Sequence, residues 1–131
     1  MKQLRQLSRQ ETLFIGGETH RVYQHTGGLI LLDASDRPVF GYETFRGYLE
    51  ARLASVPQFR WKLHEVPLGL DLPYWVADEA FSYDRHIRRI AVPFPGDATA
   101  LGELVSYLYS KHLDRSRPLW ETWFVEGLPD G

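Results

Sequence analysis

The chain has 131 residues, 44% of them apolar, and its 15 basic and 17 acidic residues give a net charge of −2. This length and composition are typical of one folded domain and argue against intrinsic disorder. The nearly balanced charge provides no bulk attraction to nucleic acid, so we expect no nucleic-acid partner. There is no cysteine, which excludes disulfides, thiolate metal sites and a cysteine nucleophile.

The sequence carries no pattern for export or for membrane insertion. Residues 1–6 are polar and charged, and the apolar stretch that follows such a start in a signal peptide is missing. The densest apolar run, Leu29 to Leu32, is far too short to span a bilayer. We therefore expect a cytoplasmic protein that contacts membranes only at their surface.

Three segments have the spacing of amphipathic helices. Ser8 with Glu11 three residues later forms a capping-box pattern that predicts a short helix over 8–15. A second helix is predicted over 42–55, where apolar and charged residues occupy opposite helical faces. A third follows Asp97, which is a favoured capping residue. Its apolar residues recur at i, i+3, i+4, i+7 and i+8: Leu101, Leu104, Val105, Leu108 and Tyr109.

Other segments favour strands because apolar residues alternate or cluster in short runs. The predicted strands are 22–33, 59–66, 74–76, 83–92 and 119–126, and a turn is predicted at 127–131. In the first of them, the four consecutive apolar residues 29–32 indicate burial on both faces. Helices and strands that alternate along the chain predict a mixed α/β (α+β) fold built in layers.

The common catalytic and metal-binding patterns are missing. The five histidines show no i, i+4 pair and no accompanying carboxylate or cysteine set, so we expect no metal site. No glycine-rich phosphate loop and no Gly-x-Ser-x-Gly elbow is present. The sequence therefore offers no catalytic residue and no site for a resident cofactor.

A basic cluster is formed by Arg85, Arg88 and Arg89 together with His86. On a strand, Arg85 and Arg89 would share one face and Arg88 would point to the other. The interpretation that we favour is a solvated strand edge that its charges protect from pairing with other strands. The alternative is a docking patch for an anionic lipid head group or for the phosphates of coenzyme A.

The segment from Leu113 to Glu121 is the most unusual part of the sequence. It places two arginines and two carboxylates around the apolar core Pro118, Leu119 and Trp120. This composition predicts a rigid, partly buried connection with internal ion pairs between a helix and a strand. A structural role is the default expectation for a tryptophan in such a place.

Over nearly its whole length the sequence also resembles a known family. Leu113 to Gly131 is similar to the segment before the active-site motif of bacterial wax ester synthase/diacylglycerol acyltransferases, and Pro118-Leu119-Trp120 matches the family's Pro-Leu-Trp motif. Five further blocks agree in the same order: Leu7-Ser8 with Phe14 and 18–19, then 25–29, 56–60, 73–76 with Asp78, and 86–89 with Pro93 and 95–96.

The resemblance implies the amino-terminal portion, here residues 1–131, of a two-lobed fold similar to chloramphenicol acetyltransferase. It implies transfer of a fatty acyl group from acyl-coenzyme A, as co-substrate, to a long-chain alcohol or diacylglycerol. Pro118, Leu119 and Trp120 are then expected to support the substrate site. The family's His-His-x-x-x-Asp-Gly motif is expected beyond Gly131, because this sequence has no His-His pair.

For this chain the resemblance implies scaffold and part of a substrate tunnel, without activity in isolation. It implies the carboxy-terminal remainder of the enzyme as a partner, and peripheral contact with the inner membrane or with lipid droplets. Two alternatives remain open. One is a stand-alone lipid- or protein-binding module, whose exposed apolar surface would favour a homodimer. The other is a condensation or acetyltransfer enzyme of the same fold.

Overall fold

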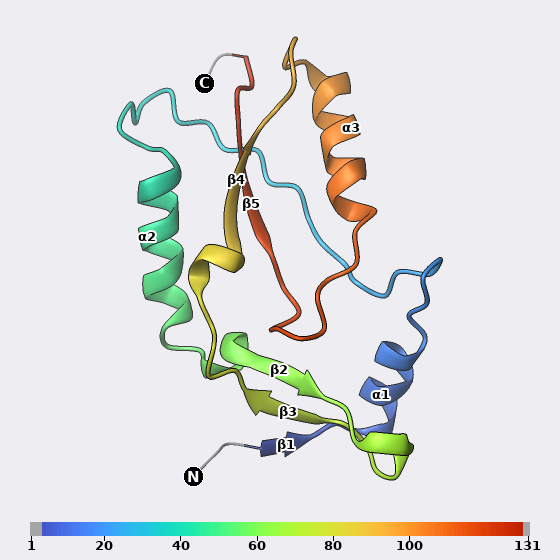
Figure 1. Cartoon of the computed structure of the whole chain (residues 1–131). Helices are drawn as coiled ribbons and strands as arrows, with labels where there is room; N and C mark the ends of the chain where they lie inside the picture. Colours follow the sequence, from blue (N-terminus) through green and yellow to red (C-terminus); the bar gives the residue numbers. More distant parts are fainter. Residues whose placement is uncertain (1–3, 130–131) are drawn as a thin grey trace. The chain divides into compact units, whose positions relative to one another are not determined.

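A computed structural model describes residues 4–129, which form two compact units (Figure 1). Each unit is assembled from three separate stretches of the chain. Unit 1 contains 4–27, 56–81 and 113–120, and unit 2 contains 28–55, 82–112 and 121–129. The polypeptide therefore passes from one unit to the other five times along its length.

Unit 1 is built on a three-stranded antiparallel sheet with the order β1-β3-β2. Its strands are β1 (Leu4–Gln6), β2 (Trp61–His64) and β3 (Tyr74–Ala77). Leu63 pairs with Trp75 and is buried. Its neighbours on β2 point to the opposite face because side chains alternate along a strand.

The first helix of unit 1, α1 (Arg9–Gly16), begins with the predicted capping box. Ser8 Oγ accepts a hydrogen bond from the Glu11 amide at 3.2 Å, and the Ser8 amide donates to Glu11 Oε2 at 2.8 Å. The helix is fixed to the sheet just before its start, where buried Leu7 donates its amide to the Pro73 carbonyl at 2.9 Å. The prediction of this helix is confirmed.

The capping box gives α1 a defined dependence on pH. The Ser8 amide, assisted by Arg5, lowers the pKa of Glu11 below its ordinary value of 4.5. The stabilisation is therefore present above pH 4.5 and is lost as the pH falls through the lower folded-state pKa. We expect Glu11→Gln, which keeps a capping side chain, to remove this acid sensitivity, whereas Ser8→Ala costs about 1 kcal/mol at neutral pH.

Urea denaturation at pH 7 and at pH 3.5 measures both effects. An unfolding midpoint that falls with acid as steeply in Glu11→Gln as in the unmodified chain would contradict this assignment.

Unit 2 contains two parallel strands, β4 (Ile87–Ala91) and β5 (Thr122–Glu126), which pair from Ile87↔Thr122 onward. Helix α3 (Ala98–Tyr109) lies between them in sequence, and Asp97 caps it by accepting from the Ala100 amide at 2.9 Å. The buried side chains of Val92, Ala100 and Leu104 pack with partly buried residues of β4, β5 and α3 into the core of this unit.

The other face of the two-stranded sheet packs against α2 (Tyr42–Leu53). Three aromatic rings from α2 and the residues before it surround Phe124, with centroid distances of 5.3 to 6.2 Å: Phe40, Tyr42 and Phe45. The next residue, Val125, packs against the core on the α3 side. Unit 2 thus has a helix on each face of its sheet (Figure 1), and the predicted mixed α/β class is confirmed.

Three predicted strands are shorter than expected, and in two of them the predicted first residues form a 3-10 helix instead. The 3-10 helix Pro57–Arg60 precedes β2, and the 3-10 helix Tyr83–Arg85 precedes β4. Strand β5 begins at Thr122, three residues later than predicted. Residues 74–76 form part of β3 as expected. The turn predicted at 127–131 lies partly outside the described residues.

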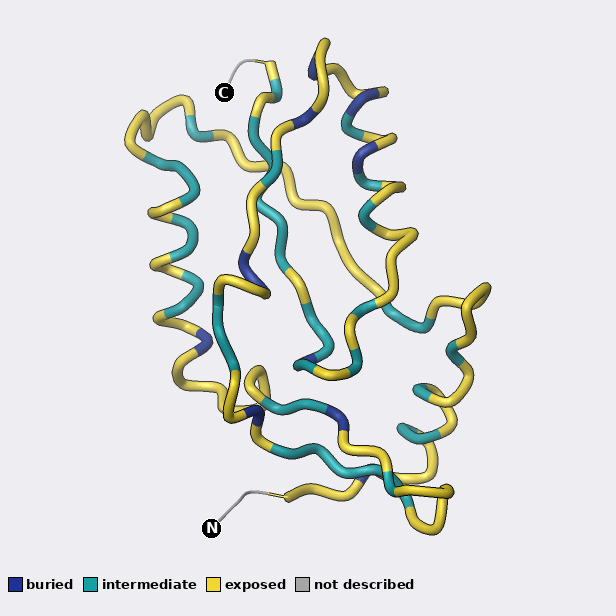
Figure 2. The backbone as a smooth tube through the Cα atoms, viewed as in Figure 1, coloured by how far each residue is buried: buried dark blue, intermediate teal, exposed yellow. Residues whose placement is uncertain are grey.

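The strand predicted over 22–33 is wrong. Val22 makes one isolated bridge to Thr19, and residues 23–34 form no strand. The run Leu29 to Leu32, expected to be buried on both faces, is 55% to 80% exposed (Figure 2). An apolar composition indicates that a segment could be buried as a strand of a sheet. A strand forms only where a neighbouring strand pairs with it through backbone hydrogen bonds.

Candidate functional site

The segment 113–120 leads from α3 towards β5 and begins with a tight turn. Asp114 Oδ1 accepts hydrogen bonds from the amide and the hydroxyl of Ser116 at 2.9 and 2.6 Å. Arg117 Nε lies 3.3 Å from Asp114 Oδ2. The predicted internal ion pair is therefore present, and it closes the turn before Pro118.

Arg115 joins this segment to two other parts of unit 1. Its Nη2 donates to the Ile15 carbonyl at 2.6 Å, and its Nη1 donates to Glu65 Oε1 at 3.1 Å. Its Nε lies 3.8 Å from Glu18 Oε1, whose side chain is only 15% exposed. The Ile15 carbonyl also accepts from the Glu18 amide at 3.3 Å. Because the last carbonyls of a helix carry partial negative charge, a guanidinium at the end of α1 is favourable.

Trp120 fixes the other end of the segment. Its indole Nε1 donates to the Phe59 carbonyl at 2.8 Å, and its ring meets the Phe59 ring edge-to-face at 5.5 Å. The Phe81 ring lies 6.5 Å away on a tilted plane. Pro118 is buried and accepts a hydrogen bond from the Trp120 amide at 2.9 Å. The segment is thus partly buried and rigid, as the sequence predicts; its role in supporting a substrate site stays a prediction.

Sequence reasoning missed the residues that receive Trp120. Phe59 lies in the 3-10 helix before β2, and Phe81 follows the turn after β3. The same turn holds the buried carboxylate of Asp78, which pairs with Lys62 at 3.0 Å. The sequence contains block 56–60 as a family motif. No local pattern indicates which residue would donate a hydrogen bond to the carbonyl groups of that block.

The basic cluster divides in the structure. Arg85 ends a 3-10 helix, so the prediction that it shares a strand face with Arg89 is wrong. The Arg88 guanidinium lies 4.1 Å from the centroid of Trp123, whereas Arg89 lies 5.5 Å from the ring of Tyr42 on the other face. All three arginines are exposed, and the docking role stays a prediction.

His86, which the sequence groups with the three arginines, is buried, with only 3% of its surface exposed. Its backbone supports the start of the parallel pair, because its carbonyl accepts from the Thr122 amide at 2.7 Å. His86 is therefore a buried residue, whereas the three arginines are exposed.

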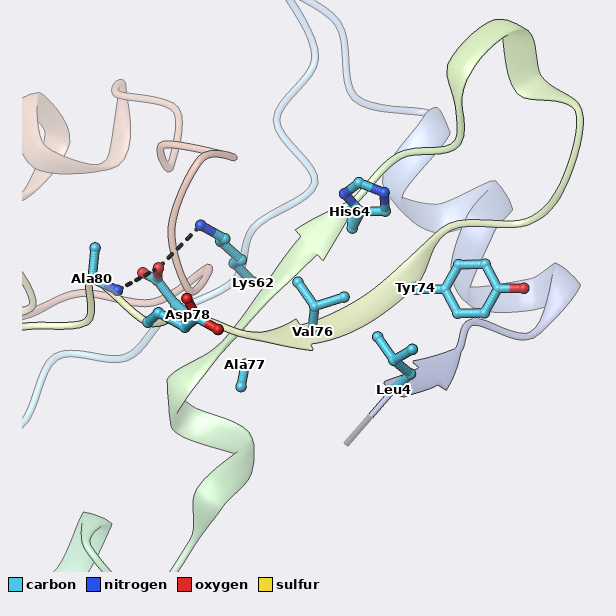
Figure 3. Close-up of a pocket in the computed structure, with 9 residues that line it drawn as sticks. Leu4, Lys62, His64, Tyr74, Val76, Ala77, Asp78 and Ala80 are labelled. Carbon is cyan, nitrogen blue, oxygen red and sulfur yellow. Dashed lines mark hydrogen bonds and ion pairs between the residues drawn. The ribbon is translucent and has the colours of Figure 1, made fainter. Parts of the chain in front are cut away.

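A cavity of about 610 Å³ opens over one face of β2 and β3 (Figure 3). It is lined by aliphatic side chains, by His64 and Tyr74, and by the Lys62–Asp78 pair. The Lys62 ammonium is engaged by Asp78, whose Oδ1 also accepts from the Ala80 amide at 3.2 Å. This pair ties β2 to the turn after β3. Among residues 4–129 no group of histidine and carboxylate side chains could hold a metal ion.

The fold and the 113–120 segment match one class of protein. A solved wax ester synthase/diacylglycerol acyltransferase from Marinobacter aquaeolei VT8 superposes with a TM-score of 0.70 at 26% sequence identity, over 95% of this chain and 31% of that one. The family model of the wax ester synthase/diacylglycerol acyltransferase catalytic domain matches residues 7–131. The chain belongs to this family.

Relatives in Mycobacterium tuberculosis support the same conclusion. One protein named as a diacylglycerol O-acyltransferase in strain H37Rv is 38% identical over 129 residues, covering 98% of this chain and 27% of the relative. The protein of that name called tgs3 is 44% identical over 101 residues, covering 77% of this chain and 37% of the relative. The matched part of the chain therefore spans only 27% to 37% of the length of these proteins.

No helix within residues 4–129 has the length and apolar character needed to cross a membrane.

Proposed function

We propose that the full natural polypeptide to which this sequence belongs transfers a fatty acyl group from acyl-coenzyme A to the hydroxyl of a long-chain alcohol or diacylglycerol. Acyl-coenzyme A is a co-substrate, and the reaction needs no resident cofactor. The observation that carries the proposal is the family match over residues 7–131 together with the intact Pro118–Trp120 segment, held by the Phe59 carbonyl. The names of the relatives support the same reaction class.

The chemistry requires a base because a neutral alcohol is a weak nucleophile. A histidine whose pKa lies near the working pH accepts the hydroxyl proton as the oxygen attacks the thioester carbonyl carbon. The new carbon–oxygen ester bond forms, the carbon–sulfur bond breaks, and the proton passes to the leaving thiolate of coenzyme A. We assign this base to the His-His-x-x-x-Asp-Gly motif of the family, and we assign none of the five histidines of this chain to it.

Within that enzyme, we assign residues 1–131 a scaffolding role and part of the wall of the acyl or alcohol site. Pro118, Leu119 and Trp120 support the site through their fixed backbone. The partners are then the lipid substrates and the remainder of the polypeptide, and the place of action is the cytoplasm, at the surface of the inner membrane or of lipid droplets.

Ester formation tests the proposal. The purified full polypeptide is incubated with labelled palmitoyl-coenzyme A and either hexadecanol or dioleoylglycerol, and both the ester and the free thiol are measured. We expect the two products in equal amounts, and no ester from residues 1–131 alone. Hydrolysis of acyl-coenzyme A without ester, or ester made by residues 1–131, would contradict the proposed division of roles.

A further inference from the structure

The turn between β2 and β3 exposes an unusual amount of aliphatic surface. Leu68 and Leu70 are 93% and 80% exposed, and Gly69 separates them. No residue from Val66 to Leu70 is charged, whereas Glu65 and Asp71 flank the stretch on either side. We call residues 66–70 the apolar tip.

The backbone of the apolar tip holds Leu68 outward. Leu68 has φ +60°, the left-handed region that side chains other than glycine and asparagine rarely adopt. The turn closes through hydrogen bonds from the Gly69 amide to the Val66 carbonyl at 3.1 Å and from the Leu70 amide to the Pro67 carbonyl at 3.4 Å. A leucine in this conformation gains no packing in exchange, because almost all of its surface is open.

We propose that the apolar tip inserts into the acyl-chain region of a lipid surface. Lipid offers no hydrogen-bond partner, so an inserted backbone must satisfy its own polar groups. The tip meets part of this condition, because Pro67 has no amide proton and the amides of Gly69 and Leu70 donate to the carbonyls of Val66 and Pro67 within the turn. The charges of Glu65 and Asp71 lie where the tip would leave the lipid and meet water.

The chemistry of the tip favours lipid over a protein partner. Protein interfaces draw most of their binding energy from tryptophan, tyrosine and arginine, and leucine is under-represented among those residues. The tip contains only valine, proline, leucine and glycine. Transfer of aliphatic side chains into hydrocarbon is favourable without any specific geometry, which suits two leucines on a turn.

Helix α1 adds apolar surface at the same end of the sheet. Gln6 Nε2 donates to Asp71 Oδ1 at 2.9 Å, so the end of β1, just before the cap of α1, lies beside the base of the apolar tip. Figure 1 shows α1 next to the loop between β2 and β3. On α1, Leu13 is 76% exposed and Phe14 is 54% exposed. The inference deepens the proposed function, because a lipid surface is where water-insoluble alcohols and diacylglycerols reside.

The test is co-sedimentation of the full polypeptide with phosphatidylcholine vesicles. The variant Leu68→Asn with Leu70→Ser removes both aliphatic chains, and asparagine tolerates the left-handed backbone. The matched control is Val39→Ser, which removes an equally open aliphatic side chain (87% exposed) from unit 2. We expect the partition of the double variant onto vesicles to fall about tenfold, with no change in the control.

Salt separates insertion from electrostatic docking. Binding through the apolar tip should persist at 0.5 M NaCl and on vesicles without anionic lipid, whereas binding through Arg85, Arg88 and Arg89 would need anionic lipid and would weaken with salt. Unchanged partition of the double variant overturns the proposal. A large loss of folding stability in that variant also overturns it, because it would mean that the leucines pack against protein.

Activity measurements separate this inference from the proposed function. With a short-chain, water-soluble alcohol as acceptor, the double variant should be as active as the unmodified enzyme, whereas its rate on vesicle-bound diacylglycerol should fall. If the unmodified enzyme makes no ester from the short-chain alcohol and none from diacylglycerol, the proposed reaction is contradicted. The vesicle measurement still decides the role of the apolar tip in that case.

Discussion

Replacing Trp120 by alanine is expected to lower the free energy of unfolding by about 3 kcal/mol, the low end of the range for a large aromatic because the ring is only partly buried. The loss has two sources: ring contacts with Phe59 and Phe81, and the hydrogen bond from the indole to the Phe59 carbonyl. Urea denaturation of the full polypeptide measures the change.

Trp120→Phe separates these two sources. Phenylalanine keeps an aromatic ring against Phe59 but cannot donate to its carbonyl, so we expect a loss of about 1 kcal/mol. If Trp120 also positions the substrate site, ester formation by the folded fraction should fall in Trp120→Phe more than its small loss of stability explains. A fully active, normally folded Trp120→Phe with an equally active Trp120→Ala would show that the motif has no part in the reaction.

Arg115→Met is expected to cost about 2 kcal/mol of folding stability. The substitution leaves the Ile15 carbonyl without its charged donor and leaves Glu18, whose side chain is largely buried, without a nearby cation. Arg115→Lys should recover part of this loss, because an ammonium keeps the charge but cannot reach several acceptors as a guanidinium does. Thermal or urea unfolding of the three proteins provides the comparison.

Arg117 supplies the matched control in the same segment. It pairs with Asp114 three residues away and contacts no other charged group across the described residues. Because such local, partly exposed pairs contribute little, Arg117→Met should cost no more than about 0.5 kcal/mol. Equal losses in Arg115→Met and Arg117→Met would mean that Arg115 does not connect the segment to α1 and β2.

The helices could be predicted from the sequence because their determinants are local. Ser8 and Glu11 lie three residues apart, and Asp97 caps a helix whose apolar spacing is regular. The class of the fold follows from the same local information. The family followed from ordered blocks such as Pro118–Trp120, and the match over residues 7–131 confirms it.

The errors concern contacts between residues far apart in sequence. The run Leu29 to Leu32 has the composition of a buried strand, but burial depends on a neighbour that composition does not specify. Arg85 was placed on a strand face because a three-residue 3-10 helix such as Tyr83–Arg85 has no clear signal in the sequence. The indole of Trp120 binds a carbonyl 61 residues earlier, and no local pattern predicts a pairing at that distance.

The interleaving of the two units restricts how this region can be taken apart. Every contiguous fragment that contains all of unit 1 must also contain both 28–55 and 82–112 of unit 2. Deletion from either end therefore damages both units before it isolates one. Of the four tryptophans in residues 1–131, Trp123 lies in unit 2 and the other three lie in unit 1. Point substitutions of these tryptophans therefore allow fluorescence to report on each unit of this region separately, without cutting the chain.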